Sequence, residues 1–131
     1  MMNKLVLLGD EAIAQGAIDA GMSGIYAYPG TPSTEITEYV DRLMASRESK
    51  GVDSPKVHVT WSANEKTATE SALGMSYAGK RTMCCMKHVG LNVAADPFMN
   101  SAITGVNGGF IIVSADDPSM HSSQNQCQNS L

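Results

Sequence analysis

The chain has 131 residues, of which 43% are hydrophobic and 17% are charged. This length and balance indicate an ordinary soluble globular chain, and we interpret residues 1–131 as a single domain with a core of adequate size. The formal net charge of −4 provides no basic surface, so we expect no binding to nucleic acid through phosphates.

The first apolar segment, Leu5–Leu8, is too short for a signal peptide or a membrane span. We therefore expect a cytoplasmic protein without membrane contact. The segment fits a short strand or the entry to a first helix. That helix is predicted from Glu11 to about Ala20, capped by Asp10 and ended by Gly21.

The next predicted unit is a strand over 25–28, a loop over 29–33 and a helix from about Ser33 to Ser46. Thr31 followed by Pro32 fits an N-cap with proline at the first helical position. A threonine at this place could also donate a hydrogen bond to an anion. Residues 48–56 are polar and predict a surface loop.

The stretch from Val57 to Lys80 forms the central predicted unit. A β-branched run over 57–61 predicts a buried strand, and a helix should run from Glu65 to Ala78. Ser62 and Glu65 have the spacing of a capping box. Glu65 would also lie where a strand ends and a helix begins, which is where open α/β sheets bind ligands. Both roles for Glu65 stay open from the residues alone.

The last predicted elements are strands over 81–86 and 109–114, separated by a helix from about Leu91 to Ser101 that Pro97 should bend or interrupt. Both strands are continuous apolar runs, which are typical of strands buried on two faces. Strands that alternate with helices predict an α/β fold with a doubly wound, mostly parallel sheet and helices on both faces.

Polar, charged and glycine-containing loops would gather at one edge of that sheet, because parallel strands end on the same side. They predict a ligand site there, although loops are polar in general. Lys87 and His88 could bind a substrate, or could be incidental loop residues, and His121 is too isolated to be assigned as a ligand. The loops in question are 28–31, 62–65, 87–92 and 116–118.

The cysteines are Cys84, Cys85 and Cys127. Adjacent residues of a strand face opposite sides, so Cys84 and Cys85 should not bind one ion together. No C-x-x-C pair is present, and we expect neither a zinc site nor an iron–sulfur cluster within this chain. We interpret the cysteines as free thiols in a reducing compartment.

Four loop motifs, in register over nearly the whole chain, resemble the alpha subunit of the indolepyruvate branch of the thiamine-diphosphate-dependent 2-oxoacid:ferredoxin oxidoreductase family. The motifs are Tyr28-Pro29-Gly30-Thr31-Pro32-Ser33, Trp61-Ser62-Ala63-Asn64-Glu65-Lys66, Met86-Lys87-His88-Val89-Gly90-Leu91-Asn92, and Ala115-Asp116-Asp117-Pro118 followed by His121-Ser122-Ser123-Gln124-Asn125. The resemblance implies a thiamine-diphosphate-binding fold. It also implies that the chain is the pyrimidine-binding domain, as the N-terminal fragment of a longer subunit.

The resemblance also implies an activity and site residues. Family members decarboxylate a 2-oxoacid in the presence of coenzyme A and pass electrons to ferredoxin; the indolepyruvate branch uses aryl pyruvates. Glu65 matches the glutamate that hydrogen-bonds the aminopyrimidine ring and stabilises its imino tautomer. Thr31 matches a threonine near the substrate carboxylate, and His88 is assigned to substrate as well. The cofactor-binding residues would be Glu65 with Pro29, Gly30, Lys87, Gly90 and Asn92.

Two departures from the family pattern limit what the chain should do alone. The pyruvate branch carries a substrate-binding arginine where Ala115-Asp116-Asp117 stands, so the substrate carboxylate must be recognised differently. The Gly-Asp-Gly…Asn motif that holds the diphosphate and Mg²⁺ is absent, and Gly9-Asp10-Glu11 is not that motif. We expect the diphosphate-binding domain, Mg²⁺, the [4Fe-4S] clusters and a second (beta) subunit to come from elsewhere in an oligomeric enzyme, and the isolated chain to have no turnover.

Two other classes of function remain open. The hydroxyl-rich loop at 30–34 could cradle a phosphate in a flavodoxin-like binding or electron-transfer module. Alternatively, the same fold could serve as a non-catalytic assembly subunit with an inactive site.

Overall fold

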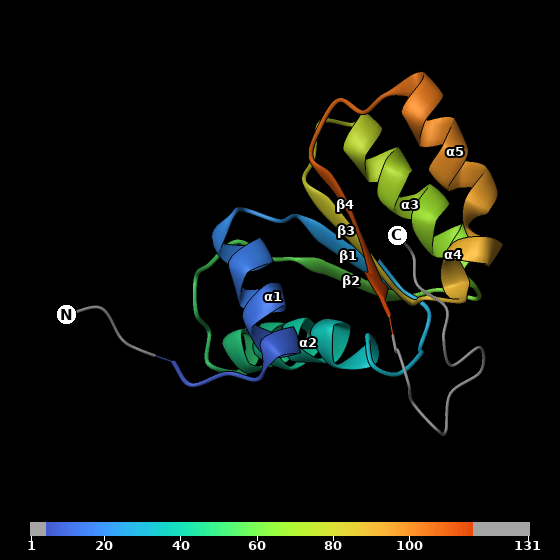
Figure 1. The fold of residues 1–131 in the computed structure, drawn as a ribbon. Coiled ribbons are helices and arrows are strands. Elements are labelled where there is room, and N and C mark those ends of the chain that lie inside the picture. The colour runs from blue at the N-terminus through green and yellow to red at the C-terminus, as the bar shows by residue number, and fades with distance from the viewer. Residues whose placement is uncertain (1–4, 117–131) are drawn as a thin grey trace.

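The structure is a computed structural model, and it describes residues 5–116. Helices and strands alternate along the chain (Figure 1). The elements are α1 (Gly9–Asp19), β1 (Gly24–Ala27), α2 (Thr34–Ser49), β2 (His58–Trp61), α3 (Glu65–Tyr77), β3 (Thr82–Lys87), α4 (Gly90–Val93), α5 (Ala95–Thr104) and β4 (Phe110–Ala115). Asp117, His121 and Cys127, which were considered above, lie outside the described residues.

The strands within residues 5–116 form a four-stranded sheet in the order β2-β1-β3-β4. Every pairing is parallel, and Ala27 stands beside Trp61 of β2 on one side and Cys85 of β3 on the other. The chain moves from β1 to β2 in one direction and from β2 past β1 to β3 in the other. The predicted α/β class, with a doubly wound parallel sheet, is confirmed.

Helices cover both faces of the sheet, as predicted (Figure 1). On one face, α1 and α2 pack on a cluster that includes Ile25, Met83 and Cys85, all nearly inaccessible to solvent. On the other face, α3 and α4 pack on Tyr26 and Cys84. Consecutive residues of one strand therefore serve two cores, as the alternation of side chains in a strand requires. The expectation that Cys84 and Cys85 face opposite sides is confirmed.

Two strands predicted to be buried lie at the edges of the sheet. Only Val57, just before β2, is buried in the predicted strand 57–61, and Trp61 is 38% exposed. In β4, Ile111 is 51% exposed. An apolar run indicates that a segment is a strand, but it does not specify which neighbours lie beside it, so the burial of these two strands was predicted wrongly.

The starts of the first two helices also differ from the prediction. Leu8 is the N-cap of α1, and its N–H donates to the Glu11 carboxylate at 3.1 Å, so Asp10 lies inside the first turn and is not the cap. Helix α2 begins at Thr34 after Ser33, so the predicted cap at Thr31 is wrong. The segment before α1 forms no strand, and Val6 is fully exposed.

The helix predicted over 91–101 is interrupted, but at Ala94 rather than at Pro97. Pro97 lies in the first turn of α5, where a missing N–H costs little. Its ring would clash with the carbonyl four residues earlier in a continuous helix, and that residue is Val93, the last of α4. The predicted stops are confirmed, since Gly21 and Gly79 have φ of 80° and 83°. No helix within residues 5–116 has the length and apolar character needed to cross a membrane.

Candidate active site at the carboxyl edge of the sheet

The predicted loops meet at one edge of the sheet, because all strands are parallel and end at Ala27, Trp61, Lys87 and Ala115. The crossover direction reverses between β1 and β3, and α2 and α4 then lie on opposite faces (Figure 1). Open α/β sheets bind ligands in the crevice beyond such a reversal. The loops after β1 and β3 therefore flank the position where a ligand is expected.

Glu65 begins α3 at this edge and is only 9% exposed. The predicted capping box of Ser62 and Glu65 is wrong. The N-cap is Asn64, whose Oδ1 accepts hydrogen bonds from the Thr67 N–H at 2.9 Å and from the Thr67 hydroxyl at 3.1 Å. Since Asn64 performs the capping, the carboxylate of Glu65 is available for another role.

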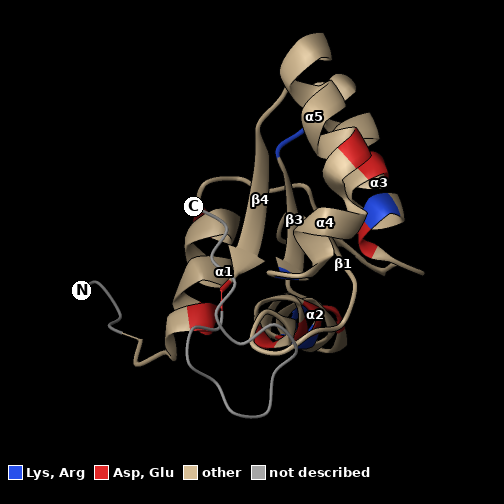
Figure 2. Ribbon diagram, turned by 45° about the vertical axis from the view of Figure 1, so that its right-hand side comes forward, with Lys and Arg blue, Asp and Glu red and all other residues tan. Residues whose placement is uncertain are grey.

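The Glu65 carboxylate makes no hydrogen bond or ion pair with any residue within 5–116. Its neighbour Lys66 points elsewhere and pairs with Asp96 at 3.0 Å and with Glu70 at 3.9 Å. Figure 2 shows acidic and basic residues on α3, whereas the ribbon of β4 carries none. A buried carboxylate without a partner is costly, so this one is suited to a hydrogen-bond donor from outside the described residues.

The backbone carbonyl of Glu65 is bound by the side chain of Thr69, one turn further along α3. The Thr69 hydroxyl donates to the Glu65 carbonyl at 2.8 Å and lies 3.5 Å from the Cys84 sulfur. Burial raises the pKa of Cys84 to about 11, and the nearby charge of Glu65 adds to the rise. Cys84 therefore stays a neutral thiol beneath the site, and it is not a nucleophile at neutral pH.

The two predicted cofactor-binding glycines are each in contact with a charged residue of this chain. A Cβ on Gly90 would lie 2.6 Å from the Glu65 Oε1, and a Cβ on Gly30 would lie 3.0 Å from the Lys87 Cβ. Gly30 thus allows the loop after β1 to approach the end of β3. Lys87 ends β3 and Glu65 follows β2, so both charged residues lie at the same edge of the sheet.

The loop between β1 and α2 uses its own polar groups. The Gly30 N–H donates to the Thr34 hydroxyl at 2.9 Å, and the Gly30 carbonyl accepts from the Ser33 N–H at 2.9 Å and the Ser33 hydroxyl at 2.8 Å. A phosphate cradle needs unpaired amide donors, and two of those in this loop are already used. Thr31 is exposed, and Pro29 lines a shallow groove with Trp61.

The remaining predicted residues are divided between the surface and the interior. Asn92 is exposed on α4 at the same edge. His88 is fully buried, and its backbone N–H donates to the Ala115 carbonyl at 3.1 Å. This burial argues against the predicted contact of the imidazole with substrate. Asp116 follows β4 at the edge and is partly buried.

Sequence reasoning missed Asn64 and the pair of Thr69 and Cys84. Asn64 was recognisable, because asparagine just before a helix caps as well as serine does. Thr69 lies four residues after Glu65 on the same helical face, a spacing at which threonine often bonds back to the earlier carbonyl. Its contact with Cys84 joins a helix to a strand and carries no local signal.

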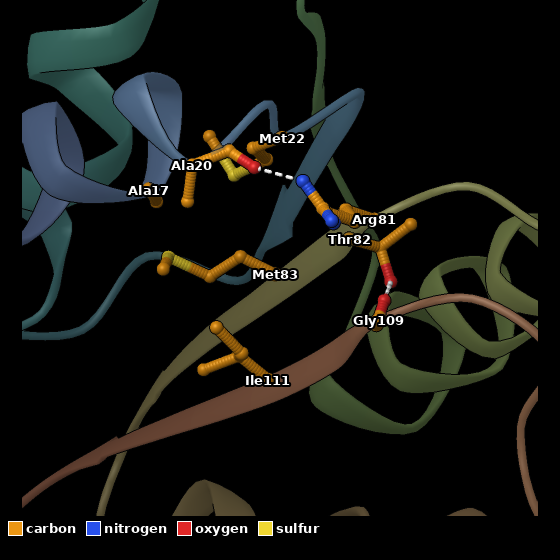
Figure 3. A pocket seen from close by; sticks show the side chains of 8 residues that line it. All are labelled: Ala17, Ala20, Met22, Arg81, Thr82, Met83, Gly109 and Ile111. Carbon is orange, nitrogen blue, oxygen red and sulfur yellow. Dashed lines mark hydrogen bonds between the residues drawn. The ribbon is translucent and has the colours of Figure 1, made fainter.

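A cavity of about 410 Å³ lies at the opposite end of the sheet (Figure 3). It opens beside Arg81 and Gly109, where β3 and β4 begin, and its lining is largely apolar. The Arg81 guanidinium donates to the Ala20 carbonyl. None of the predicted site residues lines this cavity, so it marks an uncovered part of the α1 face and is separate from the candidate site. No cluster of metal-ligating side chains occurs among residues 5–116.

The sequence matches one family model over residues 15–104, that of the thiamine-diphosphate-binding domain of pyruvate flavodoxin/ferredoxin oxidoreductases. Curated relatives are indolepyruvate oxidoreductase subunits IorA. The protein of Archaeoglobus fulgidus is 55% identical over 126 residues, which is 96% of this chain and 20% of the relative. That of Thermococcus kodakarensis is 50% identical over 94% of this chain and 18% of the relative. The chain thus spans about a fifth of the length of these curated relatives.

Among solved structures, the chain is similar to a 2-oxoglutarate:ferredoxin oxidoreductase from Magnetococcus marinus with 2-oxoglutarate, coenzyme A and succinyl-CoA bound. The TM-score is 0.68 and the identity 26%, over 88% of this chain and 19% of that one. The family match and these relatives agree with the resemblance seen in the loop motifs. The chain belongs to the thiamine-diphosphate-binding domain family of the pyruvate flavodoxin/ferredoxin oxidoreductases.

Proposed function

We propose that this chain is the pyrimidine-binding domain of an enzyme that oxidatively decarboxylates indolepyruvate and other aryl pyruvates to acyl-CoA. One observation carries the proposal. The Glu65 carboxylate is 9% exposed at the carboxyl edge of the sheet, and within residues 5–116 it has no hydrogen-bond or ion-pair partner. The indolepyruvate oxidoreductase subunits among the relatives support the choice of substrate class.

The residues at the edge fit an aminopyrimidine ring. Such a ring offers nitrogen donors and acceptors, and Glu65 is an acceptor without a partner in the described chain. We assign Glu65, Lys87 and Asn92 to the cofactor, with Pro29 and Gly30 as the backbone wall of the loop after β1. Thr31 is exposed on that loop and is assigned to the substrate carboxylate. His88 receives no direct contact, because its side chain is buried.

When bound, thiamine diphosphate supplies an acidic carbon that adds to the keto carbon of the substrate and then accepts the electrons released with CO₂. Glu65 would hold a proton on the ring nitrogen of the aminopyrimidine and so favour its imino tautomer. Its burial strengthens that hydrogen bond, because water competes less in a site of low dielectric constant. The capping by Asn64 leaves both oxygens of the carboxylate available for this task.

The other components lie outside this chain in the proposal. The diphosphate group and Mg²⁺ would be bound by a separate diphosphate-binding domain. Coenzyme A, ferredoxin, the [4Fe-4S] clusters and a beta subunit would complete an oligomeric, cytoplasmic enzyme. The related structure from Magnetococcus marinus was solved with 2-oxoglutarate and coenzyme A bound, which supports an acyl-CoA product.

The structure is less favourable to a flavodoxin-like module. Its phosphate would have to bind the loop at 30–34, where the Gly30 and Ser33 amides already donate within the loop. A non-catalytic assembly subunit would have the same fold, and the substitution described next distinguishes it from a catalytic one.

Glu65→Gln tests the proposal in the complete enzyme, because glutamine keeps the shape of the side chain but loses the charge. We expect aryl-pyruvate-dependent reduction of ferredoxin to fall by about 100-fold to 10,000-fold. The matched control is Glu70→Gln, which changes an exposed carboxylate one turn further along α3. Its activity should equal that of the unsubstituted enzyme, and undiminished activity of Glu65→Gln would exclude the proposed role of Glu65.

The separation between domains can be tested with the isolated chain. We expect residues 1–131 alone to have no turnover even with thiamine diphosphate and Mg²⁺ added. Measurable aryl-pyruvate decarboxylation by this purified chain would contradict the assignment of the diphosphate anchor to another domain. A yellow, flavin-containing preparation would instead favour the flavodoxin-like alternative.

A further inference from the structure

We propose that Gly90 is a positioning residue, whose lack of a side chain fixes where the Glu65 carboxylate lies. The three heavy atoms that a Cβ on Gly90 would first meet all belong to Glu65: Cγ at 2.6 Å, Oε1 at 2.6 Å and Cδ at 2.9 Å. Real Cβ atoms do not approach other atoms so closely. The acidic side chain therefore lies directly against the backbone at the start of α4.

The backbone itself gives no reason for a glycine at position 90. Among the described residues, the glycines with positive φ are Gly21, Gly51, Gly79 and Gly105. Gly90 is instead the first residue of a helical turn, where alanine is the better residue by propensity. The obstacle to a larger residue is thus the side chain of Glu65.

A Cβ at position 90 would push the carboxylate outward. We expect little inward movement, because Ala68, Cys84 and Met86 in the core beneath α3 are fully buried. The α3 backbone at Glu65 is also fixed, by the Asn64 cap and by the Thr69 hydroxyl on the Glu65 carbonyl. We therefore expect the side chain to rotate toward solvent.

The contact between Gly90 and Glu65 is a property of the chain, whereas its effect on catalysis rests on the proposed function of Glu65. If Glu65 holds a proton on the aminopyrimidine, a displacement of about 1 Å is enough to reduce its effect by about 100-fold. Gly90 would then act through Glu65 and need not touch the cofactor itself.

The first test measures the position of Glu65 without cofactor. The cofactor-free complete enzyme is treated with a water-soluble carbodiimide and an amine, and labelling of each carboxylate is quantified by mass spectrometry. In Gly90→Ala we expect labelling of Glu65 to rise to that of the exposed Glu70. The matched control Gly74→Ala, where a Cβ meets nothing within 4 Å, should leave Glu65 protected. Equal labelling of Glu65 in Gly90→Ala and the unsubstituted enzyme would overturn the proposal.

The second test measures proton handling without substrate turnover. Exchange of the cofactor C2 proton for deuterium in the loaded enzyme is followed by NMR after acid quench. Gly90→Ala should slow this exchange by at least about tenfold, and Gly74→Ala should not. If Glu65→Gln slows exchange but Gly90→Ala does not, Gly90 is not a positioning residue. If Glu65→Gln itself leaves exchange unchanged, the proposed function of Glu65 fails. The labelling experiment uses no cofactor, so it still tests separately whether Gly90 positions Glu65.

A folding defect in Gly90→Ala is also informative. The double variant Glu65→Ala/Gly90→Ala removes the side chain that the new Cβ would meet. We expect the double variant to fold even if the single variant does not. Failure of both would overturn the proposal, since the obstacle would then be something other than Glu65.

Discussion

Asn64 caps α3 through Thr67, with the Asn64 Oδ1 accepting from the Thr67 N–H at 2.9 Å. This contact is next to Glu65 in the sequence and determines what Glu65 can do. If Glu65 were needed to satisfy the start of the helix, its carboxylate would be turned back onto the backbone. Because Asn64 performs that task, the acid remains available to a ligand at the edge of the sheet.

The cap can be tested by comparing Asn64→Ala with Ser62→Ala. We expect Asn64→Ala to destabilise the protein by about 1 kcal/mol, because the Thr67 N–H loses its acceptor. Ser62→Ala should change stability by less than about 0.5 kcal/mol, since α3 is capped by Asn64 instead. Thermal unfolding of the full-length variants measures both effects. A larger loss for Ser62→Ala than for Asn64→Ala would contradict the observed cap.

A second pair of variants tests the close approach of the loop after β1 to the end of β3. Gly30→Ala places a Cβ 3.0 Å from the Lys87 Cβ, so we expect a lower thermal midpoint and a displaced Lys87. Gly16→Ala is the control, because a Cβ at that position in α1 meets nothing within 4 Å. Alanine should raise stability there by up to about 1 kcal/mol. A Gly30→Ala protein as stable as the Gly16→Ala control would show that the loop after β1 can move away from Lys87 at little cost in free energy.

The buried thiols predict a dependence of stability on alkaline pH. Burial raises the pKa of Cys84 from 9.0 to about 11 and also raises the pKa of Cys85. As pH rises above 9, the unfolded chain loses the Cys84 proton first and the folded chain keeps it. The folded state binds more protons, so stability falls with pH between about 9 and 11, by about 2–3 kcal/mol in total for Cys84.

Urea unfolding at several pH values checks this expectation. The midpoint should decline from pH 9 upward in the unsubstituted protein and decline less steeply in Cys84→Ala. The comparison uses the slope with pH, so a uniform loss of stability from the missing sulfur does not affect it. Identical slopes for the two proteins would mean that folding does not change the pKa of Cys84.

Much of the fold could be predicted from the sequence because the relevant signals are local. The apolar run of β3 predicts a strand buried on both faces, and five of its six residues are buried. Gly79 predicts the end of α3, where φ is 83°. The parallel order of the strands then places the loops after them at one edge, which is where Glu65, Lys87 and Asn92 lie.

The sequence could not show which strands form the sheet edges. The β4 run Phe110–Ala115 has the apolar character of a central strand, yet Ile111 is half exposed on an edge. Burial depends on which segments lie on either side of a strand, and that is decided by contacts between residues far apart in the chain. The burial of His88, a loop residue by sequence, has the same origin.

By itself, the sequence determined the α/β class and the loops that meet at the carboxyl edge of the sheet, because each depends on residue types at short spacing. The residues alone left the role of Glu65 open, and its assignment to the cofactor rests on the family resemblance. Only the tertiary structure decided that Asn64 rather than Ser62 caps α3, and that Gly90 lies against Glu65. Ser62 and Asn64 lie two residues apart, and both residue types are favoured caps, so residue type alone does not choose between them. The Gly90 contact joins residues 25 positions apart, and it exists because α3 and the turn after β3 pack together at the same edge of the sheet.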